Sequence, residues 1–321
     1  MTGAAEPLMS VVICTRNRAQ YLAWALESLM RQTLDPKWFE IIVVDNASTD
    51  ETAGVVRAAA PEGRIRYVME PVLGLSSARN RGWREARGRW VGYLDDDAKP
   101  VETWLEVARR IIAERAPEIF GGPFLPFYDL PKPDWFKDEY GSRVLSDAAR
   151  ELDVYETLSG SNFFILRGLL EKHGGFKSEF GMTGNKIAYG EESELQIRIR
   201  QADPSVRSFY DPGLLIYHLV RVGKIRLAWF FETAVATARD TVGILMQFQP
   251  VPPLPHLAWT MAKAVVKAGL IVLALPFRSR REFPHYQNYL IDRLTNPLRR
   301  IVGTHYQIKR LLTRSGRSAG R

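Results

Sequence analysis

The stretch Trp90-Val-Gly-Tyr-Leu94-Asp95-Asp96-Asp97 joins an apolar run directly to three consecutive carboxylates. Adjacent like charges repel one another, so folding alone gives little reason to place three of them at the end of a buried strand. A hard divalent cation gives such a reason, because Mg²⁺ and Mn²⁺ prefer carboxylate oxygens and a substrate's phosphates can complete the ligand shell. The stretch therefore indicates either a metal-dependent site for a phosphorylated substrate or a solvated acidic turn after a strand.

On the N-terminal side of this stretch, and for some twenty residues beyond it, strands and helices alternate. Besides Trp90–Leu94, three apolar runs predict buried strands: Met9–Cys14, Glu40–Asp45 and Ile65–Met69. Helical spacing of apolar residues predicts helices near Leu22–Met30, Thr52–Ala60, Ser76–Arg87 and Val101–Arg115. This order predicts an α/β fold, Rossmann-like, with a mostly parallel sheet that has helices on both faces.

Polar residues follow three of the predicted strands: Arg16-Asn17, Asp45-Asn46 and Asp95 to Asp97. In open α/β sheets, ligands bind beyond the carboxyl ends of the strands. We therefore expect these residues to line one crevice.

Residues Gly121 to Glu156 are rich in proline and aromatic side chains and have an irregular pattern. A long structured loop of this kind is often functional. Beyond it, Phe163–Leu166 and Leu214–His218 predict strands, and Glu192–Gln201 predicts a helix. The strand and helix pattern thus continues to about residue 220.

The chain of 321 residues is long enough for one large domain or two smaller ones. Its single cysteine, Cys14, excludes an intramolecular disulfide and a cysteine-rich zinc site. The first ten residues lack the basic and apolar regions of a signal peptide, so we expect a cytoplasmic protein.

The net charge of +8 is unevenly spread along the chain. Residues Val222 to Arg321 hold 16 Lys/Arg and 4 Asp/Glu, a net of +12, which leaves −4 for the residues before them. Such asymmetry predicts a catalytic domain followed by a basic C-terminal region that binds a polyanion. An anionic membrane surface is the expected polyanion. No nucleic acid is expected, because the region lacks a recognisable nucleic-acid-binding motif.

The residue pattern of the same C-terminal region predicts helices. The first is Ile225–Met246, which is followed by a proline-rich break and by the apolar segment His256–Phe277. That segment contains Lys263 and Lys267, and its longest uncharged run, Ala268–Phe277, is too short to span a bilayer. The pattern is typical of an interfacial amphipathic helix, and a helix packed on the protein body is the alternative.

Six motifs that occur in order along the chain are similar to those of one known family. They are Ser10-Val-Val-Ile-Cys-Thr-Arg-Asn-Arg18, Ile41-Ile-Val-Val-Asp-Asn-Ala-Ser-Thr-Asp50, Ala78-Arg-Asn-Arg-Gly82, Tyr93-Leu-Asp-Asp-Asp97, Gly160-Ser-Asn-Phe163 and Gly190-Glu-Glu-Ser-Glu-Leu195. Together they resemble family 2 of the inverting glycosyltransferases, which have the GT-A fold. The resemblance implies a glycosyltransferase domain over residues 1–221, with a nucleotide-sugar half up to about residue 120 and an acceptor half after it, followed by a helical basic region over 222–321.

For the donor, the resemblance implies that Asp45 binds the uracil or thymine ring, flanked by Thr15, Arg16 and Asn17. Capping of the following helix is the alternative for Asp45. The resemblance also implies sugar-nucleotide contacts for Arg79 and Asn80, because a guanidinium suits a diphosphate. A solvated helix face is the alternative for Arg79.

For the metal, the resemblance implies a bound Mg²⁺ or Mn²⁺ on Asp97, with Asp95 or Asp96 facing the ribose and the metal. The triple aspartate leaves this assignment uncertain by one residue. His218, at the end of a predicted strand, is a further candidate metal ligand or a structural histidine.

An inverting transfer needs one base that takes the proton from the acceptor hydroxyl. The family usually has Glu-Asp where this chain has Glu191-Glu192, so Glu192 is the expected base and Glu191 the second candidate. Charge complementing the helix dipole is the alternative for both. Gly160 and Asn162 match the family's acceptor segment, and Trp135 is a candidate for stacking on an acceptor sugar or for packing beneath its loop.

These expectations combine into a metal-dependent inverting transfer of a sugar from a nucleoside-diphosphate sugar to an acceptor hydroxyl, and the resemblance implies that the nucleoside is uridine. The basic region suggests a peripheral position on the inner face of the cell membrane, where a lipid-linked saccharide is the expected acceptor. The rival interpretations are a nucleotidyltransferase acting on sugar phosphates and a non-catalytic binding protein with the same fold.

Overall fold

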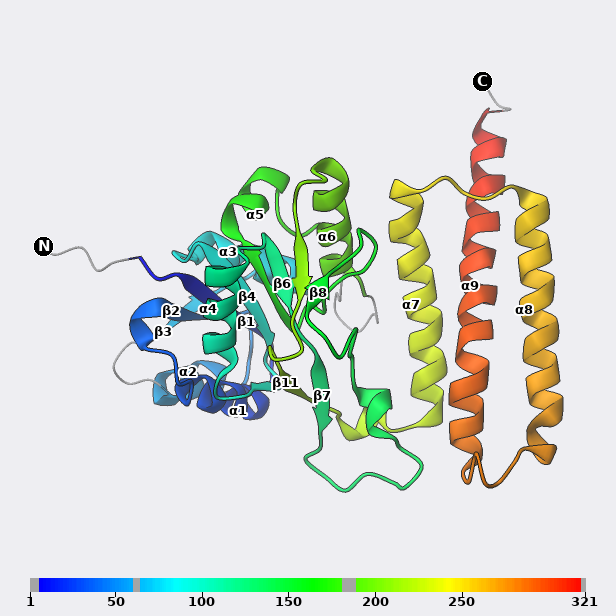
Figure 1. Cartoon of the computed structure of the whole chain (residues 1–321), viewed down its shortest axis with the longest axis horizontal. Coiled ribbons are helices and arrows are strands. Elements are labelled where there is room, and N and C mark those ends of the chain that lie inside the picture. The colour runs from blue at the N-terminus through cyan, green and yellow to red at the C-terminus, as the bar shows by residue number, and fades with distance from the viewer. Residues whose placement is uncertain (1–5, 60–63, 181–188, 319–321) are drawn as a thin grey trace, which may run out of the picture. The chain divides into compact units, whose positions relative to one another are not determined.

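A computed structural model describes residues 6–59, 64–180 and 189–318 of the chain (Figure 1). Ala60, the last residue of one predicted helix, and residues 319–321 of the predicted C-terminal region lie outside the described residues. The described residues form two compact units. The first unit holds residues up to 127, then 138–180 and 191–219, and the second holds 128–137, 189–190 and 220–318.

The first unit is built on an eight-stranded sheet in the order β3-β2-β1-β4-β9-β6-β10-β8. The four strands β3, β2, β1 and β4 are mutually parallel, as are β6 and β10, whereas β9 and β8 run antiparallel to their neighbours. The strands are β1 Met9–Thr15, β2 Phe39–Asp45, β3 Ile65–Met69, β4 Trp90–Asp95, β6 Ile119–Gly121, β8 Arg150–Glu151, β9 Asn162–Leu166 and β10 Ser208–Tyr210.

Helices cover both faces of this sheet. In β1, Val11 and Ile13 belong to one buried hydrophobic cluster and Val12 to another, because successive side chains of a strand point to opposite faces. The helices of the first unit are α1 Ala19–Met30, α2 Thr52–Ala59, α3 Leu75–Glu85, α4 Trp104–Glu114, α5 Arg167–His173 and α6 Glu191–Ala202. The mixed α/β architecture predicted from the sequence is therefore confirmed.

The register of the sheet brings three strand ends together. Thr15 of β1 lies opposite Asp45 of β2, and Cys14 lies opposite Asp95 of β4. Because parallel strands end at the same edge, the polar residues that follow them share that edge.

A second sheet of three strands, in the order β5-β11-β7, lies in the same unit. It comprises β5 Ala98–Pro100, β11 Ile216–Leu219 and β7 Phe124–Phe127, with β11 antiparallel to β5 and parallel to β7. The stretch from residue 121 to 156, irregular by its sequence, supplies β7 and β8 and a short 3-10 helix, Asp138–Gly141.

The second unit is dominated by three long helices: α7 Leu227–Phe248, α8 Leu254–Ala274 and α9 Tyr286–Ser318. A short 3-10 helix, Leu275–Phe277, extends α8, and prolines at 250, 252 and 253 separate α7 from α8. Helix α9 packs against both α7 and α8 and lies between them (Figure 1). The C-terminal helices expected from the sequence are present.

Candidate active site

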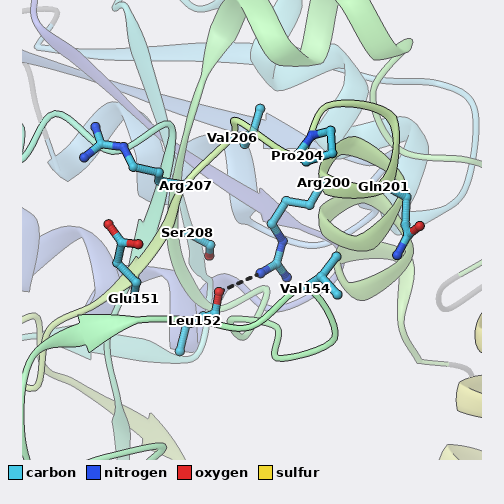
Figure 2. Close-up of a pocket in the computed structure, with 9 residues that line it drawn as sticks. All are labelled: Glu151, Leu152, Val154, Arg200, Gln201, Pro204, Val206, Arg207 and Ser208. Carbon is cyan, nitrogen blue, oxygen red and sulfur yellow. Dashed lines mark hydrogen bonds between the residues drawn. The ribbon is translucent and has the colours of Figure 1, made fainter.

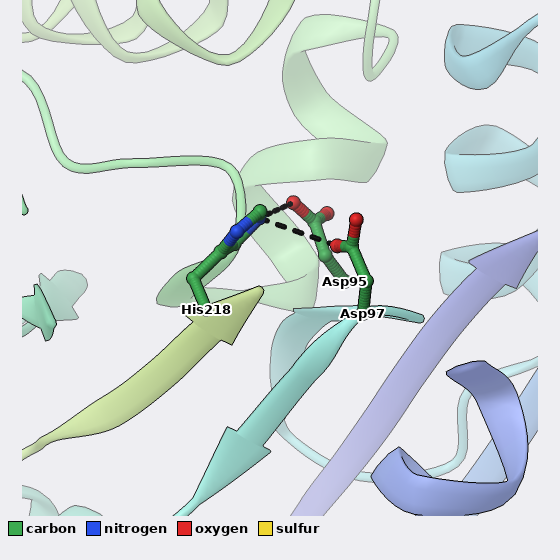
Figure 3. Close-up of side chains that lie close together, drawn as sticks. All are labelled: Asp95, Asp97 and His218. Atoms are coloured by element: carbon green, nitrogen blue, oxygen red, sulfur yellow. Dashed lines mark hydrogen bonds and ion pairs between the residues drawn. The ribbon is translucent and has the colours of Figure 1, made fainter. Parts of the chain in front are cut away.

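Two aspartates and a histidine converge just beyond the end of β4 (Figure 3). The Nε2 atom of His218 lies 3.3 Å from Oδ2 of Asp95 and 3.3 Å from Oδ1 of Asp97. One potential ligand atom from each of the three residues lies within 4.8 Å of the others. The three metal ligands proposed from the sequence are therefore neighbours in space.

Strand pairing places His218 beside the acidic turn. His218 on β11 lies opposite Ala98 on β5, the residue that follows Asp97. The backbone N–H of Leu219 donates to the carbonyl of Asp97 at 2.9 Å, which locks the register. An imidazole from residue 218 thus reaches carboxylates more than 120 positions earlier in the chain.

Asp96 turns away from this cluster. Its carboxylate accepts hydrogen bonds from the Thr15 hydroxyl at 2.8 Å and from the Arg18 guanidinium at 2.9 Å. Burial, opposed by Arg18 and reinforced by the charge of Asp97, raises the pKa of Asp96 to about 6. The local geometry therefore separates Asp95 and Asp97, which face His218, from Asp96, which faces β1.

The donor set around His218 suits a hard or borderline divalent cation. Burial acts to raise the pKa of Asp95, but the hydrogen bond and charge of His218, with Arg79 and Arg18, hold it at about 2. An ionised carboxylate, a second carboxylate and an imidazole are ligands that Mn²⁺ and Mg²⁺ accept in proteins. The residues present therefore fit such an ion.

Arg79 connects the acidic turn to the start of α6. Its guanidinium is buried and donates to Oε1 of Glu191 at 2.6 Å and to the carbonyl of Gly160 at 3.2 Å. It also lies 3.7 Å from Oδ1 of Asp95. The solvated-face alternative for Arg79 is wrong, because the side chain points into the protein and is only 5% exposed.

The two glutamates at the start of α6 have different surroundings. Glu191 is buried against Arg79, and burial, reinforced by Glu192, raises its pKa to about 7 while Arg79 opposes the shift. Glu192 is half-buried and accepts a hydrogen bond from the backbone N–H of Gly160 at 3.4 Å. Of the two carboxylates, Glu192 is therefore the more accessible.

Gly160 leaves room for the Arg79 guanidinium, which a side chain at this position would have to displace. A Cβ atom there would lie 2.5 Å from Nη2 of Arg79. Its carbonyl contacts Arg79 and its N–H contacts Glu192, so this backbone joins the buried ion pair to the accessible glutamate.

Asp45 at the end of β2 is buried and hydrogen-bonded on both oxygens. Oδ1 accepts from the backbone N–H of Ser48 at 2.8 Å, and Oδ2 accepts from the hydroxyl of Tyr67 at 2.6 Å. The capping alternative for Asp45 is wrong, because the first N–H of α2, that of Thr52, donates to Asp50. Each carboxylate oxygen can accept more than one hydrogen bond, so a nucleobase N–H remains chemically compatible with Asp45.

Arg16 and Asn17 form the turn after β1, where both are exposed. The side chain of Asn17 accepts from the backbone N–H of Thr49 at 2.7 Å, which joins this turn to the one that follows β2. Asn17 has a positive φ of 52°, a conformation that asparagine tolerates better than most residues.

Two asparagines proposed as ligand contacts are hydrogen-bonded to other parts of the protein. Asn162 has no exposed surface, and its amide binds the carbonyls of Pro123 and Leu214 and accepts from the indole of Trp104. The amide of Asn80 is hydrogen-bonded to the backbone of Phe176 and to the indole of Trp83. Because Asn162 is fully buried with these groups engaged, its proposed acceptor contact is wrong, whereas the bonds of the half-buried Asn80 favour a structural role.

Trp135 belongs to the second unit. Its ring packs edge-on against Phe136 and Phe230, and its carbonyl accepts from the amide of Asn288. This geometry favours the packing alternative for Trp135.

Two residues of the site were not among the sequence candidates. Arg18, one turn beyond β1, contacts Asp96, and Tyr67 on β3 contacts Asp45. A basic residue just beyond a strand end is a usable signal for Arg18. Tyr67 reaches Asp45 only through the pairing of β2 with β3, so no local pattern could have indicated it.

A separate hollow of the first unit lies beside β8 and β10 (Figure 2). Arg200 extends into it, but its guanidinium donates to the backbone carbonyls of Asp153 and Glu156 at 2.8 and 2.6 Å. None of the residues around this hollow belongs to the acidic cluster. We interpret Arg200 there as a structural residue that ties α6 to the loop after β8.

A family model described as Glycosyl transferase family 2 matches residues 10–174, just over half of the chain. The chain therefore belongs to glycosyl transferase family 2, and the matched residues include β1 from Ser10 onward, β2 and the acidic turn.

Known relatives extend the similarity along the chain. Glycosyltransferase AglE of Haloferax volcanii is 24% identical over 286 residues, which cover 83% of this chain and 91% of that protein. The GalNAc(5)-diNAcBac-PP-undecaprenol beta-1,3-glucosyltransferase of Campylobacter jejuni is 27% identical over 69% of this chain and 68% of the enzyme. Validoxylamine A glucosyltransferase of Streptomyces hygroscopicus subsp. limoneus is 46% identical over 99 residues, but these cover only 30% of this chain and 22% of that enzyme.

Solved structures confirm the GT-A fold. The mannosyltransferase PcManGT from Pyrobaculum calidifontis, solved with GDP-Man and Mn²⁺, has a TM-score of 0.63 at 20% identity and covers 94% of this chain and 88% of its own. S. aureus TarS 1-349, solved with UDP, has a TM-score of 0.53 at 17% identity and covers 93% of this chain and 91% of its own.

Proposed function

We propose that the protein transfers a sugar from a nucleoside-diphosphate sugar, with uridine as the nucleoside, to an acceptor hydroxyl with inversion at the anomeric carbon. The observation that carries the proposal is a continuous chain of contacts. The Asp95 carboxylate contacts both His218 and Arg79. Arg79 in turn contacts Glu191, the residue before Glu192. A candidate cation site and a candidate base are thus joined through one guanidinium.

Asp95, Asp97 and His218 would hold a divalent cation, Mg²⁺ or Mn²⁺. When bound, such an ion neutralises charge on a departing diphosphate. Arg18 lies 2.9 Å from Asp96 and 3.9 Å from Asp97, so its guanidinium adds positive charge next to the same turn. That position suits a diphosphate oxygen, which a planar guanidinium binds well.

Glu192 is the proposed general base. In the reaction, the acceptor oxygen forms a bond to the anomeric carbon while the bond from that carbon to the diphosphate oxygen breaks. The hydroxyl proton passes to Glu192, and the nucleoside diphosphate leaves with the bonding electrons. A base within hydrogen-bond reach of the attacking hydroxyl contributes about 10²- to 10⁴-fold to the rate. Glu191 instead holds Arg79, so its role is to position the helix start.

Asp45 is the proposed nucleobase contact. The N3–H of uracil is a donor, which a carboxylate can accept, and guanine also presents ring N–H donors. TarS was solved with UDP and PcManGT with GDP-Man, so the fold accommodates both bases. The resemblance of the Asp45 segment to uridine-binding members of the family favours UDP.

The proposed acceptor is a lipid-linked saccharide on the inner face of the cell membrane, in cell-surface polysaccharide or glycolipid assembly. The Campylobacter jejuni relative is named for an acceptor that ends in PP-undecaprenol. The basic C-terminal helices support peripheral contact with an anionic membrane from the cytoplasmic side. The exposed part of Glu192, beside the buried backbone of Gly160, marks where the acceptor would enter.

The experiment that tests the function is a donor screen. The full chain is incubated with UDP- and GDP-linked sugars and Mn²⁺ or Mg²⁺, and release of nucleoside diphosphate is followed. We expect turnover with a UDP-sugar and a loss of at least 100-fold in Glu192→Gln. Asp153→Asn, an exposed change outside the site, is the matched control. Binding without turnover of every sugar nucleotide would favour the non-catalytic binding protein. In a parallel incubation with a nucleoside triphosphate and a sugar phosphate, release of pyrophosphate would favour the nucleotidyltransferase.

A second measurement tests the metal assignment without relying on activity. Titration of Mn²⁺ followed by electron paramagnetic resonance should show weaker binding in Asp97→Asn and His218→Ala. Because Asp96 faces Thr15 and Arg18, Asp96→Asn should bind Mn²⁺ nearly as well as wild type. Equal losses in all three variants would contradict the assignment of Asp97 and His218, rather than Asp96, as ligands.

A further inference from the structure

Helix α8 is apolar on two opposite faces. The inner face, with Leu257 and Ala264, is buried where α8 packs against α9. The other face carries large apolar side chains at a helical spacing of seven, four, three and four residues. These side chains, here called the outer stripe, are Trp259, Val266, Leu270 and Leu273 of α8 and Phe277 of the 3-10 helix that extends it, and they are 63%, 61%, 60%, 72% and 87% exposed.

Such a stripe is unusual on a protein surface in water. Single exposed apolar residues are common, whereas a contiguous apolar patch marks an interaction site. Although its longest uncharged run is too short to span a bilayer, the whole segment Leu254–Phe277 is long and apolar enough to cross a membrane by length and composition, and almost none of it is buried. The outer stripe therefore needs an apolar partner.

The charges around the outer stripe indicate what that partner is. Lys263 and Lys267 are exposed on α8 beside the stripe, and Arg280 and Arg281 follow the end of the helix. A second copy of the chain would bring these like charges together, which is unfavourable. An anionic lipid surface offers both acyl chains for the stripe and phosphates for the basic residues.

The packing of α9 against α8 determines how α8 contacts the lipid. At a rise of about 1.5 Å per residue, Leu254–Phe277 is long enough to cross the hydrocarbon core. However, α9 runs along α8 and carries Asp292, Arg293, Arg299, Arg300, Lys309 and Arg310. A crossing α8 would bring these charges into the hydrocarbon, where charged side chains are costly.

We propose that α8 lies in the plane of an anionic bilayer surface, with the outer stripe among the upper acyl chains and Lys263 and Lys267 at the headgroups. The inference deepens the membrane association of the proposed function, by assigning the surface and the mode of contact. Long lysine side chains can reach the headgroups while their stems remain in apolar surroundings.

The test measures binding of the full chain to vesicles by co-sedimentation. Vesicles of phosphatidylglycerol mixed with phosphatidylcholine are compared with vesicles of phosphatidylcholine alone. We expect wild type to prefer the anionic vesicles, and L270E/L273E to lower the partition coefficient at least tenfold. K263E/K267E should lower it roughly tenfold on anionic vesicles and little on neutral ones. V144E, which changes an exposed valine of the first unit, is the matched control and should bind like wild type.

Three results would overturn the proposal. Unchanged vesicle binding by L270E/L273E would exclude the outer stripe as the contact. Retention of wild type on vesicles after a high-pH carbonate wash would indicate a crossing helix. A change from dimer to monomer in L270E/L273E, measured by light scattering without lipid and accompanied by no vesicle binding of wild type, would assign the stripe to a second copy.

Folding and activity are measured separately from binding. Circular dichroism should show native helix content in L270E/L273E and K263E/K267E, because all four residues are exposed. Donor turnover without lipid should also be unchanged, so loss of vesicle binding with retained turnover isolates the membrane surface. Failure of the proposed function would appear as absent donor turnover in wild type, whatever the vesicles show.

Discussion

The buried pair of Arg79 and Glu191 is expected to hold the first unit together as well as the site. Their side chains are each 5% exposed and lie 2.6 Å apart. Removing one partner of a buried ion pair leaves the other charge uncompensated, at a cost of about 3–5 kcal/mol. Arg79→Met should therefore lower the free energy of unfolding by about that amount at pH 8.

The penalty should depend on pH in a defined direction. Burial already raises the pKa of Glu191 to about 7, and loss of Arg79 removes the group that opposes this shift. The native state of the variant then holds a proton that the unfolded state, with an ordinary glutamate pKa, has released. Stability therefore falls as pH rises through the interval between the two pKa values, by up to about 1.4 kcal/mol for each pH unit.

A double-mutant cycle measures the coupling. Urea unfolding of wild type, Arg79→Met, Glu191→Gln and the double variant is followed by tryptophan fluorescence at pH 6 and pH 8. The double variant should be more stable than Arg79→Met at pH 8, by about 2 kcal/mol, because no buried charge remains unpaired. Arg84→Met, an exposed position on the same helix α3, should stay within about 0.5 kcal/mol of wild type. Additive effects of the two substitutions, or an equal penalty at both pH values, would refute the reasoning.

Three further predictions concern single residues. Gly160→Ala should reduce turnover at least tenfold, because the added Cβ would lie 2.5 Å from Arg79 and must displace the guanidinium. Wild-type rates in steady-state kinetics would contradict this prediction. Tyr67→Phe removes the hydroxyl that binds Asp45 at 2.6 Å and should weaken nucleoside-diphosphate binding roughly threefold to tenfold in calorimetry. Unchanged affinity would show that Tyr67 has no part in nucleobase binding. Asn162→Ala should lower the free energy of unfolding by about 3 kcal/mol, because it leaves two carbonyls and an indole N–H without their buried partner. A stable variant with a raised acceptor KM would instead support acceptor binding by Asn162.

Hydrophobic patterning was sufficient for the strands that carry the site. Met9–Cys14, Glu40–Asp45 and Trp90–Leu94 are each within one residue of the observed β1, β2 and β4. A buried parallel strand needs a continuous apolar run on both faces, and that requirement is local. Short strands such as β7 and β8 escaped prediction, because they pair at few positions and lack a clear period.

The asparagines show where motif reasoning failed. Gly160-Ser-Asn162 and Arg79-Asn80 are short polar stretches, and an amide suits a sugar hydroxyl as well as a backbone carbonyl. Whether Asn162 meets a ligand or Pro123 depends on which strands flank β9. Sequence spacing carries no information on that choice.

The sequence by itself determined the α/β class, the strand ends at which the polar residues gather, the family of the chain and the basic, apolar character of its C-terminal helices. These are properties of composition, period and motif order, which do not require distant contacts. Only the tertiary structure decided which carboxylates face His218, that Arg79 pairs with Glu191, and which face of α8 is buried against α9. Each of these depends on side chains far apart in the chain, which strand register and helix packing bring within a few ångströms.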